Sequence, residues 1–370
     1  MTGGAVHGAL LLTQFCWGSA AVVNKLGLSG AGISPLLFAL IREATASPIL
    51  LALLCTAWKR NKASTAQHKL DDSSPVTSDS ACIKPSSSRR SRLILRMLPG
   101  VFIFLDQLCS LTGTMLADPV SAAAWQPSQV VFTVMLSVFL GMETLTAWKC
   151  GSMLLTVSGA LCLTFLGRMS HHSSDRESHN YSLGQVFFFV NCVSSSLEVI
   201  LWRKLLRHAT SELAHLAVMA ESYLVAACLM AGTCVSMSFS RTAVDFLCPA
   251  CNGAAWRVPP SALWSILYSV IFQTLVAYCA QAWALRYAPA SLASFYATAQ
   301  PIMAALVTCT LLVFGYNPGG VLHWPSYELL GGALIIAGLA LEEVGSRQGK
   351  KLDATEDEGT TSQEESLESD

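Results

Sequence analysis

Two glutamine–proline pairs, Gln126-Pro127 and Gln300-Pro301, are the residues whose type and spacing best suit chemistry inside a membrane. Pro127 and Pro301 are expected to break their helices, because a proline has no backbone N–H and the carbonyl four residues earlier loses its helical partner. In an apolar helix that carbonyl is costly unless it lines a polar cavity, where it accepts hydrogen bonds. The glutamine amides donate and accept, and Trp125 and Tyr296 add aromatic faces nearby. We expect these side chains to bind a small molecule; a kink satisfied by neighbouring helices is the alternative.

Several ionisable residues also fall within apolar stretches, among them Arg42, Glu43, Asp106, Glu198 and Glu221, and Glu198 is expected to form a structural salt bridge with the basic residues that follow it. Charged groups inside a membrane are costly, and most of them face the protein interior and mark a solute or proton path. Arg42 could anchor an anionic group, or it could pair with Glu43 or Asp106 as a structural contact. We predict substrate binding by Arg42 and proton coupling by Asp106 and Glu221.

The elements that position these residues are apolar helices. Hydrophobic residues make up 52% of the chain and charged residues 13%, which is unusual for a soluble domain. Apolar runs of about 20 residues, the length that crosses the hydrocarbon layer, recur along the chain. They predict ten transmembrane helices: 6–26, 34–58, 94–116, 119–141, 147–167, 182–202, 213–237, 262–285, 290–314 and 327–345. We keep the first run as a permanent span, with a cleaved signal peptide as the alternative.

The ten spans divide into two related halves, 1–174 and 175–347. In each half a glycine, Gly141 or Gly315, follows the Gln-Pro glutamine by fifteen residues. The first spans also share a pattern of Gly, Cys and Ser, and the last spans are rich in glycine. Five spans per half force the second copy to insert upside down. We therefore predict an all-α integral membrane protein built from two inverted five-helix repeats.

The chain resembles EamA-type transporters of the drug/metabolite transporter superfamily, and within them the plant walls-are-thin-like branch. The resemblance covers nearly the whole membrane part and implies ten helices in two EamA repeats with transport of a small solute. The second repeat departs from the family pattern at Gly315-Tyr316-Asn317, where an acidic residue is expected. The residues that carry the resemblance are Trp17-Gly18, Pro35 with Leu40-Ile41-Arg42, Gln126-Pro127 before Gly141-x-Glu143, and Gln300-Pro301 with Gly315.

The segments between spans predict the orientation. Most of the 23 lysines and arginines fall on one side of the ten-span topology, which predicts that both termini lie in the cytosol. The protein is expected in the plasma membrane or an endomembrane. Residues 59–92 are rich in Ser, Lys and Arg and are expected to form a disordered cytosolic loop. The acidic tail, residues 348–370, is expected to be disordered as well.

Few residues outside the spans suggest a site. Cys248 and Cys251 fall in a predicted external loop and could form a disulfide or remain two thiols. His171, His172 and His179 are assigned no metal, because surface histidines are usually solvated. Asn180 begins a glycosylation sequon close to a helix. We expect no cofactor and no nucleic-acid partner; the lipid bilayer, a small-molecule substrate and protons are the expected partners, and a homodimer stays open.

Three classes of function fit a multi-span helical protein. A secondary transporter with a midplane site is the leading interpretation, because the two halves are related and the polar groups lie within the spans. An intramembrane enzyme is disfavoured, because the sequence contains no HExxH or GxSxG motif. A receptor or sensor would need larger loops than this sequence has.

Overall fold

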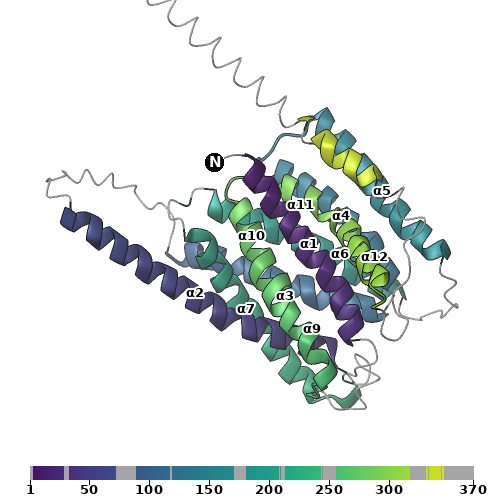
Figure 1. Cartoon of the computed structure of the whole chain (residues 1–370), viewed down its shortest axis with the longest axis horizontal. Coiled ribbons are helices and arrows are strands. Elements are labelled where there is room, and N and C mark those ends of the chain that lie inside the picture. The colour runs from purple at the N-terminus through teal and green to yellow at the C-terminus, as the bar shows by residue number, and fades with distance from the viewer. Residues whose placement is uncertain are drawn as a thin grey trace, which may run out of the picture.

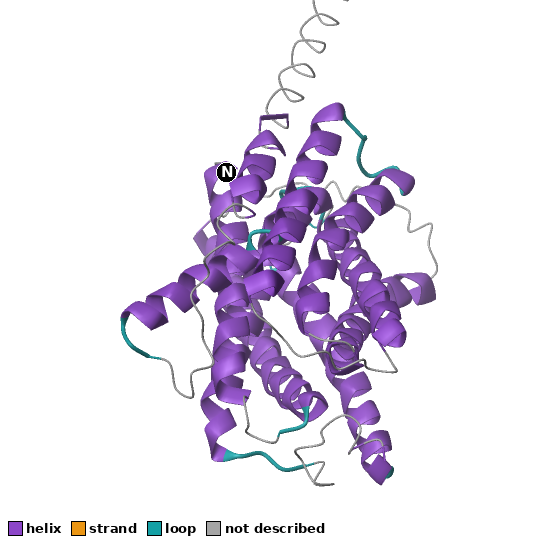
Figure 2. Cartoon of the chain, turned by 90° about the vertical axis from the view of Figure 1, so that its right-hand side faces the viewer, coloured by secondary structure: helices purple, strands orange, loops and turns teal. Residues whose placement is uncertain are grey.

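The computed structural model describes residues 3–28, 33–71, 89–116, 119–170, 181–207, 209, 213–242, 244, 256–316, 331, 333–342 and 344–345. Within that part all regular structure is helical, and the helices form one bundle (Figures 1 and 2). The long helices are α1 (Gly3–Leu28), α2 (Pro35–Asp71), α3 (Arg89–Leu116), α4 (Pro119–Phe139), α5 (Ala147–Ser170), α6 (Tyr181–Leu206) and α7 (Ala214–Ser238).

Shorter elements follow in the second half of the chain. They are the 3-10 turn η2 (Pro260–Ala262), α9 (Leu263–Tyr268), the π-helical η3 (Ser269–Val276), α10 (Ala277–Ala284), α11 (Ala290–Ala297) and α12 (Gln300–Val313). The elements from η2 to α10 run continuously and together make one membrane-length helix. Helices α11 and α12 together make another membrane-length stretch, with a turn between them.

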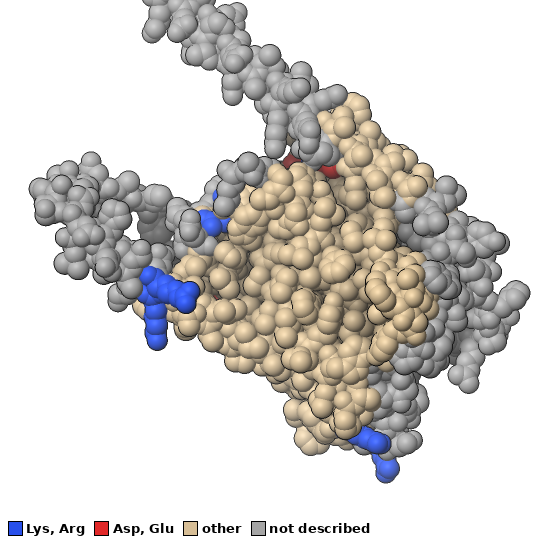
Figure 3. Space-filling view, in the orientation of Figure 1, with Lys and Arg blue, Asp and Glu red and all other residues tan. Residues whose placement is uncertain are grey.

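Seven helical stretches of the described residues are long and apolar enough to cross a membrane, which indicates an integral membrane protein. Each coincides with one of the predicted spans, to within a few residues at most ends. The face over α1, α10 and α12 is almost free of charged side chains, and the visible lysines and arginines lie at its edges (Figure 3). The seven stretches are Gly4–Asn24, Pro35–Arg60, Leu93–Gly113, Leu183–Leu206, Ala214–Ser238, Pro260–Ala284 and Ala290–Val313.

The first half of the loop predicted at 59–92 differs from the expectation. The helix α2 runs on through Asp71, so residues 59–71 are helical. This extension contains alanine, lysine and glutamine, which favour helix, and it continues from a helix that is already nucleated in the span. Residues 89–92, at the other end of the predicted loop, are also helical and begin α3. Residues 72–88 of that loop and the tail 348–370 lie outside the described residues.

The helices pack in an exchanged pattern. Helix α1 contacts α9, η3 and α10, and also α12 (Figure 1). Helix α6, at the start of the second half, contacts α3 and α4 of the first half. The first helix of each half therefore packs against the third and fourth spans of the other half. The second helices, α2 and α7, contact each other.

Glycines permit the closest of these contacts. A Cβ on Gly18 of α1 would lie 2.7 Å from the Gln300 carbonyl oxygen at the start of α12. A Cβ on Gly159 of α5 would lie 2.7 Å from the carbonyl oxygen of Gly331, which begins the last helical segment. Such approaches are available only to glycine, and they supply the tight packing on which membrane helices depend.

The helices α4 and α12 end in the same way. Gly141 and Gly315 have φ of 66° and 70°, a left-handed conformation that glycine adopts without strain. Met142 N donates to the Ser137 carbonyl and Gly141 N to that of Val138; Tyr316 N and Gly315 N make the corresponding bonds to Leu311 and Leu312. Both ends are Schellman motifs, so the matched glycines of the sequence have matched structural roles.

The two Gln-Pro pairs differ in their backbone. Pro301 lies in the first turn of α12, and a turn at residues 298–299 separates that helix from α11. Helix α4 passes through position 127 without interruption. The predicted helix break is therefore present at the second pair and absent at the first. The side chains of Gln126 and Pro127 lie outside the described part of the structure.

Candidate functional site

A polar cluster lies where α2, α3 and α6 meet. The Arg42 guanidinium donates to the Gln107 side-chain oxygen, and both residues are buried. The Asn191 amide donates to the carbonyl oxygen of Asp106 at 2.8 Å and to its carboxylate at 2.7 Å. Two donor atoms of the cluster, Arg42 Nε and Gln107 Nε2, have no hydrogen-bond partner among the described residues. The cluster thus holds a fixed cation, a carboxylate and free donors inside the bundle.

Aromatic rings form a second group around Tyr278 of α10. Edge-on contacts surround its ring, with centroid distances of 5.1 Å to Trp17, 5.2 Å to Tyr223 and 5.8 Å to Trp202. These rings come from α1, α7 and α6, so both halves of the chain contribute. Such edge-to-face pairs stabilise beyond simple burial.

Helix α6 carries members of both groups, Asn191 of the polar cluster and Trp202 of the aromatic group. The buried Glu198 lies between them in the sequence of the same helix. A carboxylate and an arginine beside aromatic faces could hold a small solute that carries both a charged part and a ring.

The π-helical segment η3 is tied to α1 by polar contacts. Trp17 donates its indole N–H to the backbone carbonyl of Gln273 at 3.1 Å. In the polar cluster, the side-chain amide of Asn191 likewise donates to a backbone carbonyl, that of Asp106. The Asn24 side-chain oxygen accepts from Ser265 at 2.8 Å and from Ser269 at 2.7 Å. A π-helical turn leaves carbonyls out of their usual register, and these turns occur often at functional sites.

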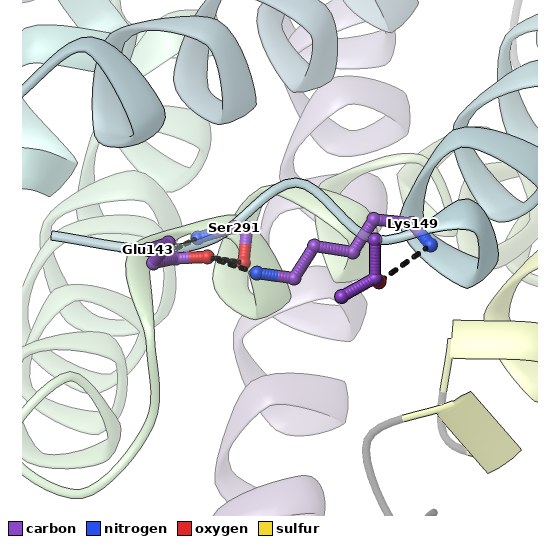
Figure 4. Close-up of polar contacts among 4 residues, drawn as sticks. Glu143, Lys149 and Ser291 are labelled. Carbon is purple, nitrogen blue, oxygen red and sulfur yellow. Dashed lines mark hydrogen bonds and ion pairs between the residues drawn. The ribbon is translucent and has the colours of Figure 1, made fainter. Parts of the chain in front are cut away.

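A third polar group lies at the end of the bundle where α4 ends and α5 begins. The Glu143 carboxylate accepts from the backbone N–H of Ser291 at 3.2 Å and from its hydroxyl (Figure 4). The Lys149 ammonium lies 2.7 Å from the same carboxylate, and both side chains are largely buried. Because Ser291 is in the first turn of α11, the carboxylate also meets the positive end of that helix. We call Glu143, Lys149 and Ser291 the latch.

Arginines hold the helix ends beside the latch. Arg203 of α6 donates to the carbonyls of Leu285 and Arg286, both at 2.8 Å, where α10 ends. Arg286 in turn donates to the Ala209 carbonyl at 3.2 Å. The turn between α10 and α11 is therefore fixed by contacts within the second half of the chain.

The structure places the predicted site residues in several locations. Arg42 and Asp106 belong to the cluster described above. Glu221 lies elsewhere, 3.5 Å from Arg96 on a largely exposed surface of α7 and α3. Trp125 faces α6, where its N–H donates to Gln185 at 2.6 Å.

Two further predicted binding residues, Tyr296 of α11 and Gln300 of α12, contact α1. The Tyr296 hydroxyl is 2.8 Å from a ring nitrogen of His7. The Gln300 backbone packs on Gly18. Cys248, Cys251, Asn180 and the three loop histidines lie outside the described residues.

Several cluster residues were missed in the sequence. Gln107 and Asn191 are uncharged, and Tyr278 is one of several aromatics within the spans, so composition alone does not single them out. The one available signal was a polar amide in an apolar run, which carries the same desolvation cost as any buried hydrogen-bonding group. Among the described residues no group of three or more His, Cys, Asp or Glu could hold a metal ion.

Comparison with known proteins supports the fold. No model of a known protein family matches the sequence. A solved structure titled "Crystal structure of protein" is similar, with a TM-score of 0.62 and 16% sequence identity. The match covers 94% of this chain and 99% of that chain. The likeness establishes a shared fold.

Proposed function

We propose that this chain is a secondary transporter of a small organic solute, of the EamA type within the drug/metabolite transporter superfamily. It works by alternating access and is coupled to protons. Its ten spans form two inverted five-helix repeats, 1–174 and 175–347, with both termini in the cytosol. The single observation that carries the proposal is that residues from both halves meet inside the bundle, both in the polar cluster and around Tyr278.

The exchanged packing supports the repeat. If residues 1–174 and 175–347 are equivalent, contacts of α1 with the third and fourth spans of the second half should mirror those of α6 with α3 and α4. This correspondence is present, and α2 contacts its counterpart α7. The Schellman ends of α4 and α12 add an independent match in local conformation. Repeats related in this way place substrate sites at their interface, near the membrane midplane.

The site suits a solute with an anionic part and an apolar or ring part. Arg42 is pre-positioned by Gln107, and its free Nε–H and the free Gln107 amide can donate to a carboxylate or similar group. The rings of Trp17 and Tyr278 supply the apolar side. The latch closes one end of the bundle, so alternating access requires its contacts to break in the conformation open to that end.

The test is flux through purified protein. Liposomes are loaded with a defined mixture of organic acids, amino acids, nucleosides and nucleotides, and solutes that leave are identified by mass spectrometry. Wild-type protein should release a subset of the mixture faster than protein-free liposomes, and Arg42→Gln should slow that release. If no component leaves faster with wild-type protein, the proposal is wrong.

A second experiment addresses the Gln-Pro pairs. Replacing both glutamines, as Gln126→Ala with Gln300→Ala, should slow solute release while the yield of folded protein stays normal, because each amide is expected to serve the solute. The control is Gln129→Ala, which removes a nearby amide that bonds Ser195 at 2.7 Å. Wild-type flux in the double variant would remove both glutamines from the site.

The topology can be tested separately. With ten spans, protease-sensitive tags at the two termini should be cleaved together, and only from the cytosolic side. Cleavage of the two tags from opposite sides would indicate an odd number of spans and would contradict the inverted repeat.

A further inference from the structure

Glu43 is an isolated acidic side chain in the middle of the bundle. It lies on α2 with an exposed fraction of 0%, and neither carboxylate oxygen has a hydrogen-bond partner among the described residues. Two other carboxylates inside the bundle are supplied with donors: Asp106 accepts from Asn191, and Glu143 from Ser291. Glu221 has Arg96 and lies partly in solvent. Glu43 has neither donor nor solvent.

The neighbours of Glu43 do not compensate a full negative charge. On α2 itself the adjacent guanidinium of Arg42 is turned to Gln107 of α3. From α3, Asp106 adds a like charge, and from α7, Cys234 lies within electrostatic range. The segment η3, which also packs on α2, carries no titratable residue, and Tyr268 of α9 donates to Ser19 instead. An ionised carboxylate so placed would lack the hydrogen bonds that buried charge requires.

A hollow opens beside the start of α2, the helix that carries Glu43. The hollow between the ends of α2 and α7 is lined by Ser34, Leu37, Trp256 and Cys234. Cys234 of α7 lines the hollow, and its Sγ lies 3.5 Å from the Leu36 carbonyl oxygen of α2. Glu43 lies seven residues further along α2, so the helix that carries it forms one wall of a hollow at the interface of two helices that are equivalent in the proposed repeat.

We propose that Glu43 is the protonation site through which this transporter couples solute movement to protons, reached through the hollow between α2 and α7. The inference rests on the proposed transport function. In the conformation described, Glu43 is a neutral carboxylic acid. When α2 and α7 separate, its O–H bond breaks, the proton passes to water in the hollow, and the electron pair remains on the carboxylate beside Arg42.

The assignment differs from the sequence expectation, which gave proton coupling to Asp106 and Glu221. Glu221 is already partnered on a largely exposed surface, and the Asp106 carboxylate is held by an amide donor. Of the three, Glu43 is the one whose carboxylate oxygens both lack a partner among the described residues, so its ionised form has no hydrogen bonds to stabilise it in this conformation.

Infrared difference spectroscopy tests the protonation directly, without any solute. Purified protein in phosphatidylcholine liposomes is compared as wild type, Glu43→Gln, Glu43→Asp and the matched control Glu221→Gln. At neutral pH, wild type and Glu221→Gln should show the C=O stretch of a protonated carboxyl group without hydrogen bonds. Glu43→Gln should lose this band and Glu43→Asp should shift it. If Glu43→Gln does not fold, the shift in Glu43→Asp decides.

The outcomes are distinct. A wild-type spectrum without this band, or a band that is the same in every variant, overturns the assignment. Proton coupling is measured in the flux assay as the effect of an imposed proton gradient on the rate of solute release. The gradient should increase the rate several-fold for wild type and leave the rate of Glu43→Gln unchanged. Gradient-driven release that persists in Glu43→Gln would also overturn the inference. Absence of all release with the infrared band intact would instead refute the transport function alone.

Discussion

Removal of the charge on Glu143 should measurably weaken the latch. In Glu143→Gln the side chain keeps its shape and can still accept from Ser291, but the charge that strengthens those bonds and attracts Lys149 is lost. Hydrogen bonds to charged groups contribute about 1.5–3 kcal/mol against about 1 kcal/mol for neutral ones. The interaction with the α11 N-terminus adds about 0.3–1 kcal/mol. We therefore expect a loss of about 2–3 kcal/mol in the free energy of unfolding.

The assay is thermal unfolding in detergent, followed by tryptophan fluorescence. For a protein of this size 1 kcal/mol corresponds to about 2 °C, so Tm should fall by about 4–6 °C. The matched control is Lys204→Gln, which removes a charge from an exposed side chain of α6 and should leave Tm unchanged. A double-mutant cycle of Glu143→Gln with Lys149→Gln should give a coupling energy of about 1 kcal/mol or more.

Two results would refute this account of the latch. One is a Tm for Glu143→Gln equal to that of Lys204→Gln. The other is a coupling energy of zero between Glu143 and Lys149, which would mean that the 2.7 Å contact contributes nothing to the folded state.

Three other substitutions have defined outcomes. Gly159→Leu should separate α5 from the last helical segment and lower Tm by several degrees, whereas Gly232→Ala, where a Cβ would meet nothing within 4 Å, should leave Tm unchanged or raise it slightly. Gly141→Ala and Gly315→Ala should each cost about 1 kcal/mol, measured in the same thermal assay, because their φ values are positive; equal costs would support equivalent helix ends. Asn191→Leu should cost about 1–3 kcal/mol by leaving the Asp106 carboxylate without its amide donor, and an unchanged Tm would show that this bond is not stabilising.

Apolar length located seven of the ten expected spans, because a membrane-length run of hydrophobic residues has few other stable structures. Breaks within spans were harder to predict. Pro301 interrupts its helix whereas α4 continues through position 127, and the same dipeptide occupies both sites. The π-helical η3 contains no proline or glycine, so its sequence gives no local signal of the irregular helix. Its Gln273 carbonyl is instead bonded by Trp17 of α1, a contact that the local sequence does not reveal.

The site was only partly predictable for a related reason. Arg42 and Asp106 were identifiable as ionisable groups in apolar runs, but a single sequence does not show which face of a helix packs inward. For this reason Glu221 was expected in the interior but lies at a surface. Glu43, which occupies a similar position along the second span of the other half, is fully buried. The partner of Glu143 is 148 positions away, and no spacing rule connects residues that far apart.

The exchanged packing of α1 and α6 has a consequence for how the protein is made. When the ribosome has synthesised the first 174 residues, α1 still lacks α10 and α12, its main neighbours in the finished bundle. The first half must therefore remain in the bilayer with Gly18 of α1 unpacked until nearly the whole chain has been inserted. Neither half made alone should reach its final arrangement, whereas the two halves made together in one cell should assemble.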